Sequence, residues 1–206
     1  MSSDPPIADE SPAAAWNARY CETPSLWTAE PNALLVRFAA GLAPGRALDV
    51  GAGEGRNAVW LASCGWQVSA LDVSDVALAR SADQAAAAGV RLQCVNADWQ
   101  EHPFGESAFE LVVMSFMHPQ PDDRDGLFER ARRALAPAGH LFVVGVHVVD
   151  HGRRGPADRE RLYTPQRLRD SLRGFDVVRC EQHESEQEHR TGRRRVTDVV
   201  AVARRA

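Results

Sequence analysis

Apolar residues recur along the chain in short runs that alternate with longer, one-sided patterns. Short apolar runs bounded by polar residues predict buried strands, whereas apolar positions three and four residues apart predict helices that bury one face. Strands are therefore expected at 47–50, 66–71, 91–95, 109–114 and 140–147. Helices are expected at 31–42, 56–64, 74–89, 124–136 and 165–174.

This alternation of strands and helices predicts an α/β fold, with a mostly parallel sheet covered by helices on both faces. Two further strand-like runs, at 175–180 and 196–203, have no helix between them and should pair as an antiparallel hairpin. The expected architecture is a Rossmann-like, seven-stranded sheet that ends in this hairpin.

The beginning of the chain has a different character. Residues 1–15 are rich in Ser, Asp, Pro and Ala and are expected to form a disordered tail. Aromatic residues appear from Trp16 onward, and the remainder, 16–206, is expected to be a single domain because a chain of this length suits one hydrophobic core.

Composition narrows the possible functions. The chain has 206 residues and a formal net charge of −4, which argues against a general nucleic-acid binder. It contains no lysine, so Schiff-base chemistry on lysine is excluded. The four cysteines lack the CxxC spacing typical of zinc sites, which favours a reducing compartment. No apolar run approaches 18 residues, so we expect a cytoplasmic protein without a membrane span.

Charge is unevenly distributed along the chain. Residues 1–150 carry 10 arginines against 19 acidic residues, whereas residues 151–206 carry 14 arginines against 9. The second part includes the run Arg193 to Arg195, which follows an acidic stretch and lacks interleaved aromatic residues, so we interpret it as a solvated turn. The basic second part favours an anionic ligand on its side of the fold.

The strongest motif lies directly after the first predicted strand, where Asp49 and Val50 run into Gly51-Ala52-Gly53-Glu54-Gly55. Glycines at every second position let the backbone turn sharply and approach a ligand. The dinucleotide fingerprint GxGxxG places its last glycine one residue later, so a nicotinamide-dependent oxidoreductase fits this spacing less well. Asp72, at the end of the next strand, is positioned to bind ribose hydroxyl groups.

This GxGxG spacing after an acidic residue resembles motif I of class I S-adenosylmethionine (SAM)-dependent methyltransferases. The run LAPAGHLFVVGV similarly resembles the turn and fifth strand of that family, with Ala138 in place of a glycine. The resemblance implies that SAM is the cofactor and that the product is S-adenosylhomocysteine. It further implies cofactor contacts from the ends of the first four strands, namely Asp49, Gly51, Gly53, Gly55, Arg56, Asp72, Val73, Asn96, Ala97, Asp98, Trp99 and Ser115.

A narrower resemblance follows from GEGRNAVWLASCGWQVSALDVS, which is similar to the tellurite-resistance and thiopurine-type small-molecule methyltransferases. Residues 16–45 resemble the N-terminal cap that closes over the cofactor in that group. Arg19, Tyr20 and Trp27 are the cap residues that the resemblance places near the cofactor. The group methylates sulfur, selenium, tellurium, oxygen and nitrogen nucleophiles, so the acceptor atom stays open.

Two histidines follow the fourth and fifth predicted strands, His118 and His147. Ligands of open α/β sheets bind at the carboxyl ends of the strands, where either imidazole could deprotonate an acceptor near neutral pH. The loop 150–163 comes next and is expected to belong to the acceptor side. No metal site is expected, because the cluster around His147 lacks the usual set of carboxylates.

The sequence thus predicts a methyltransferase that acts on a small molecule, which the charge distribution suggests is anionic. The alternatives are a nicotinamide-dependent oxidoreductase and a catalytically silent SAM-binding module. Nucleic-acid methylation is disfavoured, because Ser115-Phe116-Met117-His118 stands where amino methylases have an Asn/Asp-Pro-Pro-aromatic motif. The protein is expected to be a monomer or a homodimer.

Overall fold

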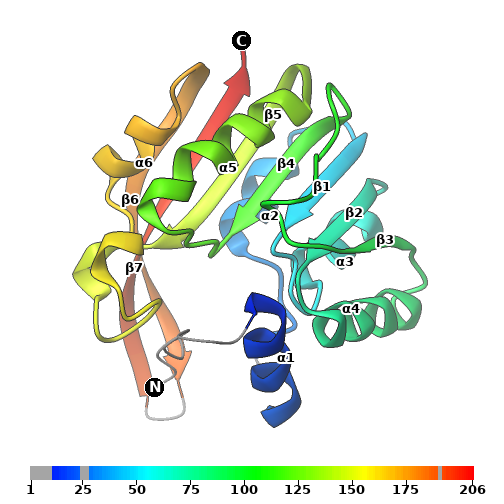
Figure 1. Cartoon of the computed structure of the whole chain (residues 1–206), viewed down its shortest axis with the longest axis horizontal. Coiled ribbons are helices and arrows are strands. Elements are labelled where there is room, and N and C mark those ends of the chain that lie inside the picture. The colour runs from blue at the N-terminus through cyan, green and yellow to red at the C-terminus, as the bar shows by residue number, and fades with distance from the viewer. Residues whose placement is uncertain (1–10, 24–27, 190–191) are drawn as a thin grey trace.

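In a computed structural model, which describes residues 11–23, 28–189 and 192–206, one seven-stranded sheet forms the centre of the molecule (Figure 1). Its strands are β1 (Arg46–Val50), β2 (Gln67–Asp72), β3 (Leu92–Asn96), β4 (Phe109–Ser115), β5 (Leu135–Val146), β6 (Phe175–His189) and β7 (Gly192–Arg205). Their order is β3-β2-β1-β4-β5-β7-β6. The first five are parallel, and β6 pairs antiparallel with β7, as the sequence predicts. Strand β7 lies between β5 and β6 and also runs antiparallel to β5.

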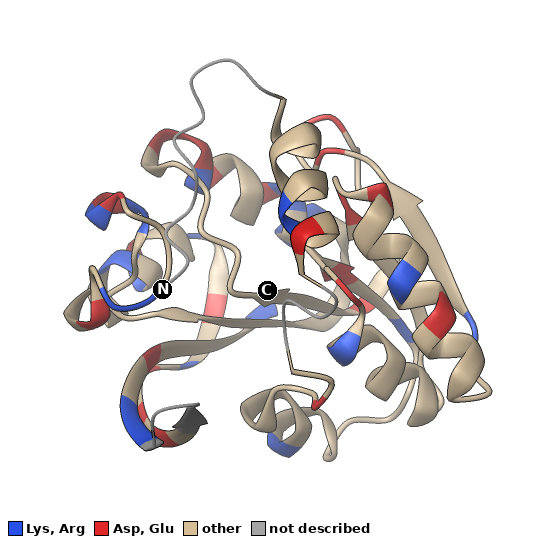
Figure 2. Ribbon diagram, turned by 90° about the horizontal axis from the view of Figure 1, so that it is seen from below, with Lys and Arg blue, Asp and Glu red and all other residues tan. Residues whose placement is uncertain are grey.

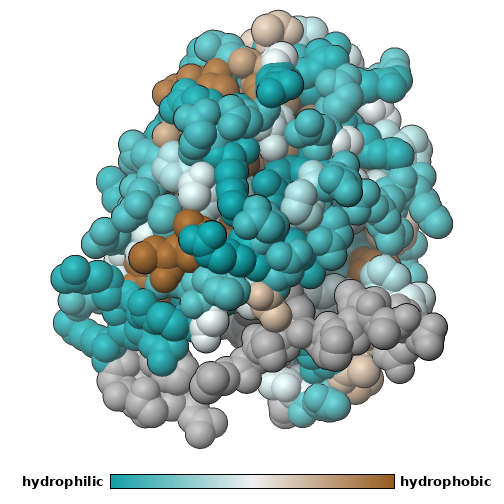
Figure 3. Space-filling view, turned by 60° about the vertical axis from the view of Figure 1, so that its left-hand side comes forward, coloured by the Kyte–Doolittle hydropathy of each residue, from teal (hydrophilic) through white to brown (hydrophobic). Residues whose placement is uncertain are grey.

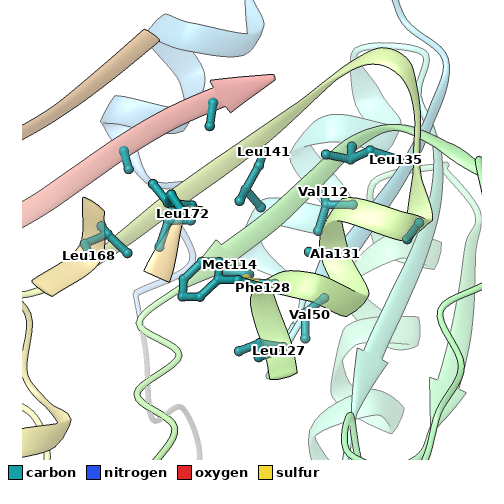
Figure 4. Close-up of a cluster of buried hydrophobic side chains, with 14 of the residues drawn as sticks. Val50, Val112, Met114, Leu127, Phe128, Ala131, Leu135, Leu141, Leu168 and Leu172 are labelled. Carbon is teal, nitrogen blue, oxygen red and sulfur yellow. The ribbon is translucent and has the colours of Figure 1, made fainter. Parts of the chain in front are cut away.

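Helices cover both faces of the sheet. They are α1 (Pro12–Glu22), α2 (Ala33–Ala39), α3 (Arg56–Ser63), α4 (Asp75–Ala87), α5 (Pro121–Ala134) and α6 (Pro165–Ser171), with short 3₁₀ turns η1 (Val148–Asp150) and η2 (Arg159–Arg161). The side chains of α5 and α6 pack on one face with Val112, Met114 and Leu141 of the sheet (Figure 4). The side chains of α2, α3 and α4 pack on the other face, because alternate residues of each strand point to opposite sides.

Several element boundaries differ from expectation. Helix α1 begins at Pro12, inside the range expected to be disordered, because Ser11 caps it by accepting the N–H of Ala14 (3.3 Å) and Pro12 occupies the first helical turn. Helix α5 ends at Ala134 rather than 136, since Leu135 already pairs with Phe109. Strands β6 and β7 are much longer than expected and continue beyond the last β5 pair, Val146 with Asp198.

The carboxyl ends of the parallel strands form one edge of the sheet, which Figure 2 turns toward the viewer. Charged residues of both signs are spread over this side of the molecule (Figure 2). At the opposite edge a hollow of about 210 Å³ lies between Leu42, Trp66 and His140, and its lining includes none of the predicted site residues that the structure describes.

Large apolar side chains are rarely exposed among the described residues. Only Val149 and Val178 are prominent, and the space-filling view shows small apolar patches separated by polar surface (Figure 3). Val178 lies at a bulge in β6, a common feature of protected edge strands. In the part of the chain that the structure describes, no helix combines the length and the apolar composition needed to cross a bilayer.

Candidate SAM-binding site

The glycine loop connects β1 to α3 in a conformation that side chains resist. Gly51, Gly53 and Gly55 all have positive φ, at 69°, 56° and 84°. A Cβ atom on Gly51 would lie 2.4 Å from the Met117 sulfur, and one on Gly55 would lie 2.0 Å from Ser81 Oγ. Steric constraints therefore require glycine at both positions. Helix α3 follows directly and begins at Arg56.

Asp49 is the buried carboxylate beneath this loop, and it is 1% exposed. Neither of its oxygens has a partner at hydrogen-bond geometry among the described residues. Burial raises the pKa of Asp49 to about 7, although the Arg56 guanidinium and the nearby Ala58 N–H oppose the shift. A buried carboxylate without partners is costly, so this side chain is suited to a cationic ligand group.

Arg56, the first residue of α3, is a largely buried cation whose guanidinium donates to Thr28 Oγ1 (3.1 Å). Burial lowers its pKa, while Asp49 and Asp198 favour the charged form. Its guanidinium also lies 5.7 Å from the centre of the Phe116 ring. Arg56 therefore links the glycine loop to the exit of β4.

Asp72 joins the end of β2 to the glycine loop. Its carboxylate accepts the N–H of Gly53 (2.8 Å) and the N–H of Ser74 (2.9 Å), and burial raises its pKa against both of these bonds. The Asn96 side-chain amide donates to the carbonyl of Val73 (2.9 Å). The glycine loop and the ends of β2 and β3 are thus hydrogen-bonded to one another.

The remaining predicted cofactor residues are less tightly connected. The Asp98 carboxylate accepts the N–H of Gln100 (2.9 Å) within its own turn, while Ala97 and Trp99 pack against the core beside α5. The Ser115 hydroxyl is buried at the end of β4 without a hydrogen-bond partner among the described residues.

On α1, the Arg19 guanidinium lies 4.9 Å from the centre of the Trp16 ring, and Tyr20 is buried. Trp27 lies outside the described residues.

His118 is buried, and both of its ring nitrogens are bonded to the backbone. Nδ1 lies 3.2 Å from the Arg161 carbonyl, and Nε2 accepts the N–H of Val146 (3.2 Å). Because Nε2 accepts, Nδ1 carries the proton and donates to Arg161. Arg161 in turn donates to the His118 carbonyl (2.7 Å). This reciprocal arrangement fastens η2 to the exits of β4 and β5, and it leaves neither nitrogen available as a general base.

His147 is half-buried at the exit of β5. Its Nδ1 accepts the N–H of Val149 (3.1 Å), so in the neutral ring the proton resides on Nε2, which is then a donor. Burial lowers its pKa, with a smaller opposing effect from Asp150. His147 therefore fits the role of a hydrogen-bond donor better than that of a base.

The segment 148–163 is anchored to the sheet by three side chains, Asp150, Arg154 and Tyr163. Asp150 is 1% exposed and accepts the N–H of Thr197 (2.9 Å), while Arg154 bridges Asp150 (3.3 Å) and Asp198 (2.9 Å). The Tyr163 hydroxyl donates to the Met117 carbonyl (2.9 Å), and burial raises its pKa to about 12. Apart from the pair Asp150–Arg154, these anchors join residues more than 40 positions apart in sequence, so no local pattern could reveal them.

Comparison with known proteins finds similarity to methyltransferases. A family model described as a methyltransferase domain matches residues 47–139. The chain is 30% identical over 151 residues to 27-O-demethylrifamycin SV methyltransferase of Amycolatopsis mediterranei, covering 69% of this chain and 55% of that protein. It is 31% identical over 159 residues to the release factor glutamine methyltransferase of Bordetella pertussis, covering 65% and 59%. The matched part of the chain spans only 39% of the length of the first curated relatives that it matches.

Among solved structures, TehB from Haemophilus influenzae superimposes with a TM-score of 0.72 at 14% identity, covering 91% of this chain and 65% of that chain. At that identity the likeness concerns the fold. The residues present also fit SAM, because the partnerless carboxylate of Asp49 suits its ammonium group and the glycine loop admits close contact. Residues 47–139 therefore match a methyltransferase domain, and the fold resembles that of TehB; together with the Asp49 site, these similarities support SAM as the cofactor.

Proposed function

We propose that this protein transfers the methyl group of SAM to a small-molecule sulfur, oxygen or nitrogen nucleophile. When bound, SAM supplies an electrophilic sulfonium methyl, so the protein has to orient the acceptor and exclude water. We assign Asp49 to the ammonium group and Asp72 to the ribose hydroxyls. Gly51, Gly53 and Gly55 would lie along the cofactor, and Ser115 would line the acceptor side.

The observation that carries the proposal is the anchoring of segment 148–163 at the carboxyl edge. Arg154 holds it through two buried carboxylates, and His118 holds it through Arg161. Helix α1 flanks the same edge on the other side (Figure 1). An edge bordered by anchored segments suits a small acceptor better than a polymer that must lie across it.

The states of the two histidines favour an acceptor that needs little help from a base. His118 uses both nitrogens for backbone bonds, and His147 accepts a backbone N–H at Nδ1. A thiol or an acidic phenol loses its proton readily near neutral pH, whereas an alcohol would need a positioned base. We therefore place thiols first among the candidate acceptors.

The positions of the arginines give only weak support to an anionic acceptor, because many of them are paired with carboxylates. Among the described residues, six arginines of the basic part lie within 4.0 Å of a carboxylate, namely Arg153, Arg154, Arg167, Arg179, Arg193 and Arg195. Much of the positive charge is thus balanced within the protein. An anionic acceptor stays a prediction, to be tested with matched pairs of carboxylate and ester.

A macromolecular acceptor is the second candidate, since one relative modifies a release factor by its name. The sequence Ser115-Phe116-Met117-His118 at the exit of β4 differs from the Asn/Asp-Pro-Pro-aromatic motif of amino methylases, which disfavours an amide or base nitrogen as the methyl acceptor.

The four cysteines are free thiols, which supports a cytoplasmic location.

The test is a turnover screen with purified protein, SAM and panels of thiols, phenols and amines, read as S-adenosylhomocysteine by mass spectrometry. We expect turnover with thiols and a loss of it in Asp72→Asn, which keeps the shape of the side chain. Turnover with a release factor or RNA, and with no small molecule, would refute the proposal. SAM binding without turnover on any acceptor would favour the silent binding module.

A further inference from the structure

Arg80 on α4 makes three hydrogen bonds that connect two separate parts of the cofactor site. Its guanidinium donates to the carbonyl of Tyr20 (2.6 Å), to the carbonyl of Thr23 (2.9 Å) and to Glu54 Oε1 (2.8 Å). The first two acceptors are the last turn and the C-cap of α1, and the third belongs to the glycine loop. One side chain thus bridges α1 and the loop.

The positive charge of Arg80 stabilises each of its hydrogen-bond partners. The carbonyl groups at the end of a helix carry partial negative charge, so a guanidinium there completes the C-terminus of α1. Glu54 is 5% exposed and lies between Gly53 and Gly55, whose positive φ values define the loop. Its carboxylate is directed at α4 rather than at solvent, and it needs a cation nearby.

A second contact fastens α1 to the same helix. Asn17 donates to Asp75 (2.6 Å) and accepts the hydroxyl of Ser74 (2.6 Å), which also caps α4 by accepting the N–H of Ala77. The first turn of α4 follows directly on Asp72, the carboxylate that holds Gly53. Helix α1 is therefore attached at two points to the helix that borders the site.

We propose that Arg80 is a positioning residue that couples the ordering of α1 to the binding of SAM at the glycine loop. The proposal rests on SAM as the cofactor. If an ordered α1 holds the loop in its binding conformation through Arg80 and Glu54, then bound SAM must stabilise α1 by the same factor, because coupling between two sites is reciprocal. Without the Arg80 bridge, SAM would still bind the loop but would no longer stabilise α1.

The experiment combines calorimetric titration of SAM with hydrogen exchange in wild type and in Arg80→Gln. In wild type we expect SAM to slow exchange both in the glycine loop and along Pro12 to Glu22. In Arg80→Gln, SAM should still slow hydrogen exchange in the glycine loop but should no longer slow it in α1. SAM affinity should fall by about tenfold, which is within the typical range for coupling between two sites.

Arg132→Gln is the matched control, because Arg132 pairs with Glu129 within α5. Arg80→Lys keeps the charge but cannot reach three acceptors, so it should restore only part of the affinity. If Arg80→Gln unfolds, Glu54→Gln and Arg80→Lys with their double variant give the same coupling by a thermodynamic cycle. Additive effects in that cycle, or SAM protection of α1 in Arg80→Gln, would overturn the proposal. An unprotected loop in wild type would instead overturn the SAM assignment.

Discussion

Replacing Asp49 by asparagine should stabilise the protein and impair its cofactor site at the same time. Burial raises the pKa of Asp49 from 3.8 to about 7. Each pKa unit corresponds to about 1.4 kcal/mol, so ionised Asp49 costs roughly 4 kcal/mol of folding free energy above pH 7. The substituted side chain would carry no charge but would still bury unpaired polar atoms, so we expect the SAM-free variant to gain about 1–4 kcal/mol.

The stability difference between wild type and Asp49→Asn should depend on pH. The folded-state pKa lies above the unfolded value, so the folded protein binds more protons between about pH 4 and pH 7 and loses stability as pH rises through that window. The gain in Asp49→Asn should therefore grow from about pH 5 to about pH 8 in urea unfolding. SAM affinity should behave in the opposite way, weakening below about pH 7 in wild type because Asp49 becomes protonated.

Calorimetric titration of SAM between about pH 5.5 and pH 7.5 measures the second effect. Losing a charged contact worth about 2 kcal/mol weakens binding by roughly 30-fold, and the variant should show a flatter pH profile. Glu110→Gln is the control, since Glu110 pairs with Arg46 at the opposite edge of the sheet. The reasoning is refuted if Asp49→Asn is no more stable near pH 8 and binds SAM with the wild-type pH profile.

Three further changes test other parts of the site. Gly55→Ala forces a positive φ and a contact with Ser81, so it should lower unfolding free energy by about 1–3 kcal/mol in urea; wild-type stability would show that the loop relaxes. Tyr163→Phe removes the bond to Met117 and should cost about 1 kcal/mol, whereas Val149→Ala at an exposed site should be neutral. His118→Gln, which can replace one backbone bond, should retain more thiol methylation than His118→Ala, and an equal loss in both would argue for imidazole chemistry.

The local signals that the sequence carries are sufficient to predict the parallel strands of the sheet and the glycine loop. Short apolar runs indicated β1 to β5, and the glycines after Asp49 marked the loop, because both features depend on neighbouring residues. The sequence does not predict helix α1 although Ser11-Pro12 is a typical helix start, because the Ser-, Asp-, Pro- and Ala-rich composition of residues 1–15 favours disorder.

The side-chain contacts of His118 and Arg80 are less predictable from the sequence, because they depend on residues that are distant along the chain. His118 was singled out by its place after β4, but its state depends on Arg161 and Val146, which are 43 and 28 residues away. The sequence of α4 gives no indication that Arg80 forms a bridge, because its three hydrogen-bond acceptors lie at the end of α1 and in the glycine loop. Contacts of this kind follow only from the assembled fold.

The position of β7 between β5 and β6 has a consequence for synthesis on the ribosome. The five parallel strands and the glycine loop are complete once Val146 has emerged, but β5 gains its second neighbour only when the residues of β7 follow. Asp198 and Thr197, which hold Arg154 and Asp150, belong to that strand. A chain that stalls or is cleaved before β7 would keep the glycine loop while leaving segment 148–163 without its contacts to Thr197 and Asp198, so the emergence of β7 determines when this segment can be anchored.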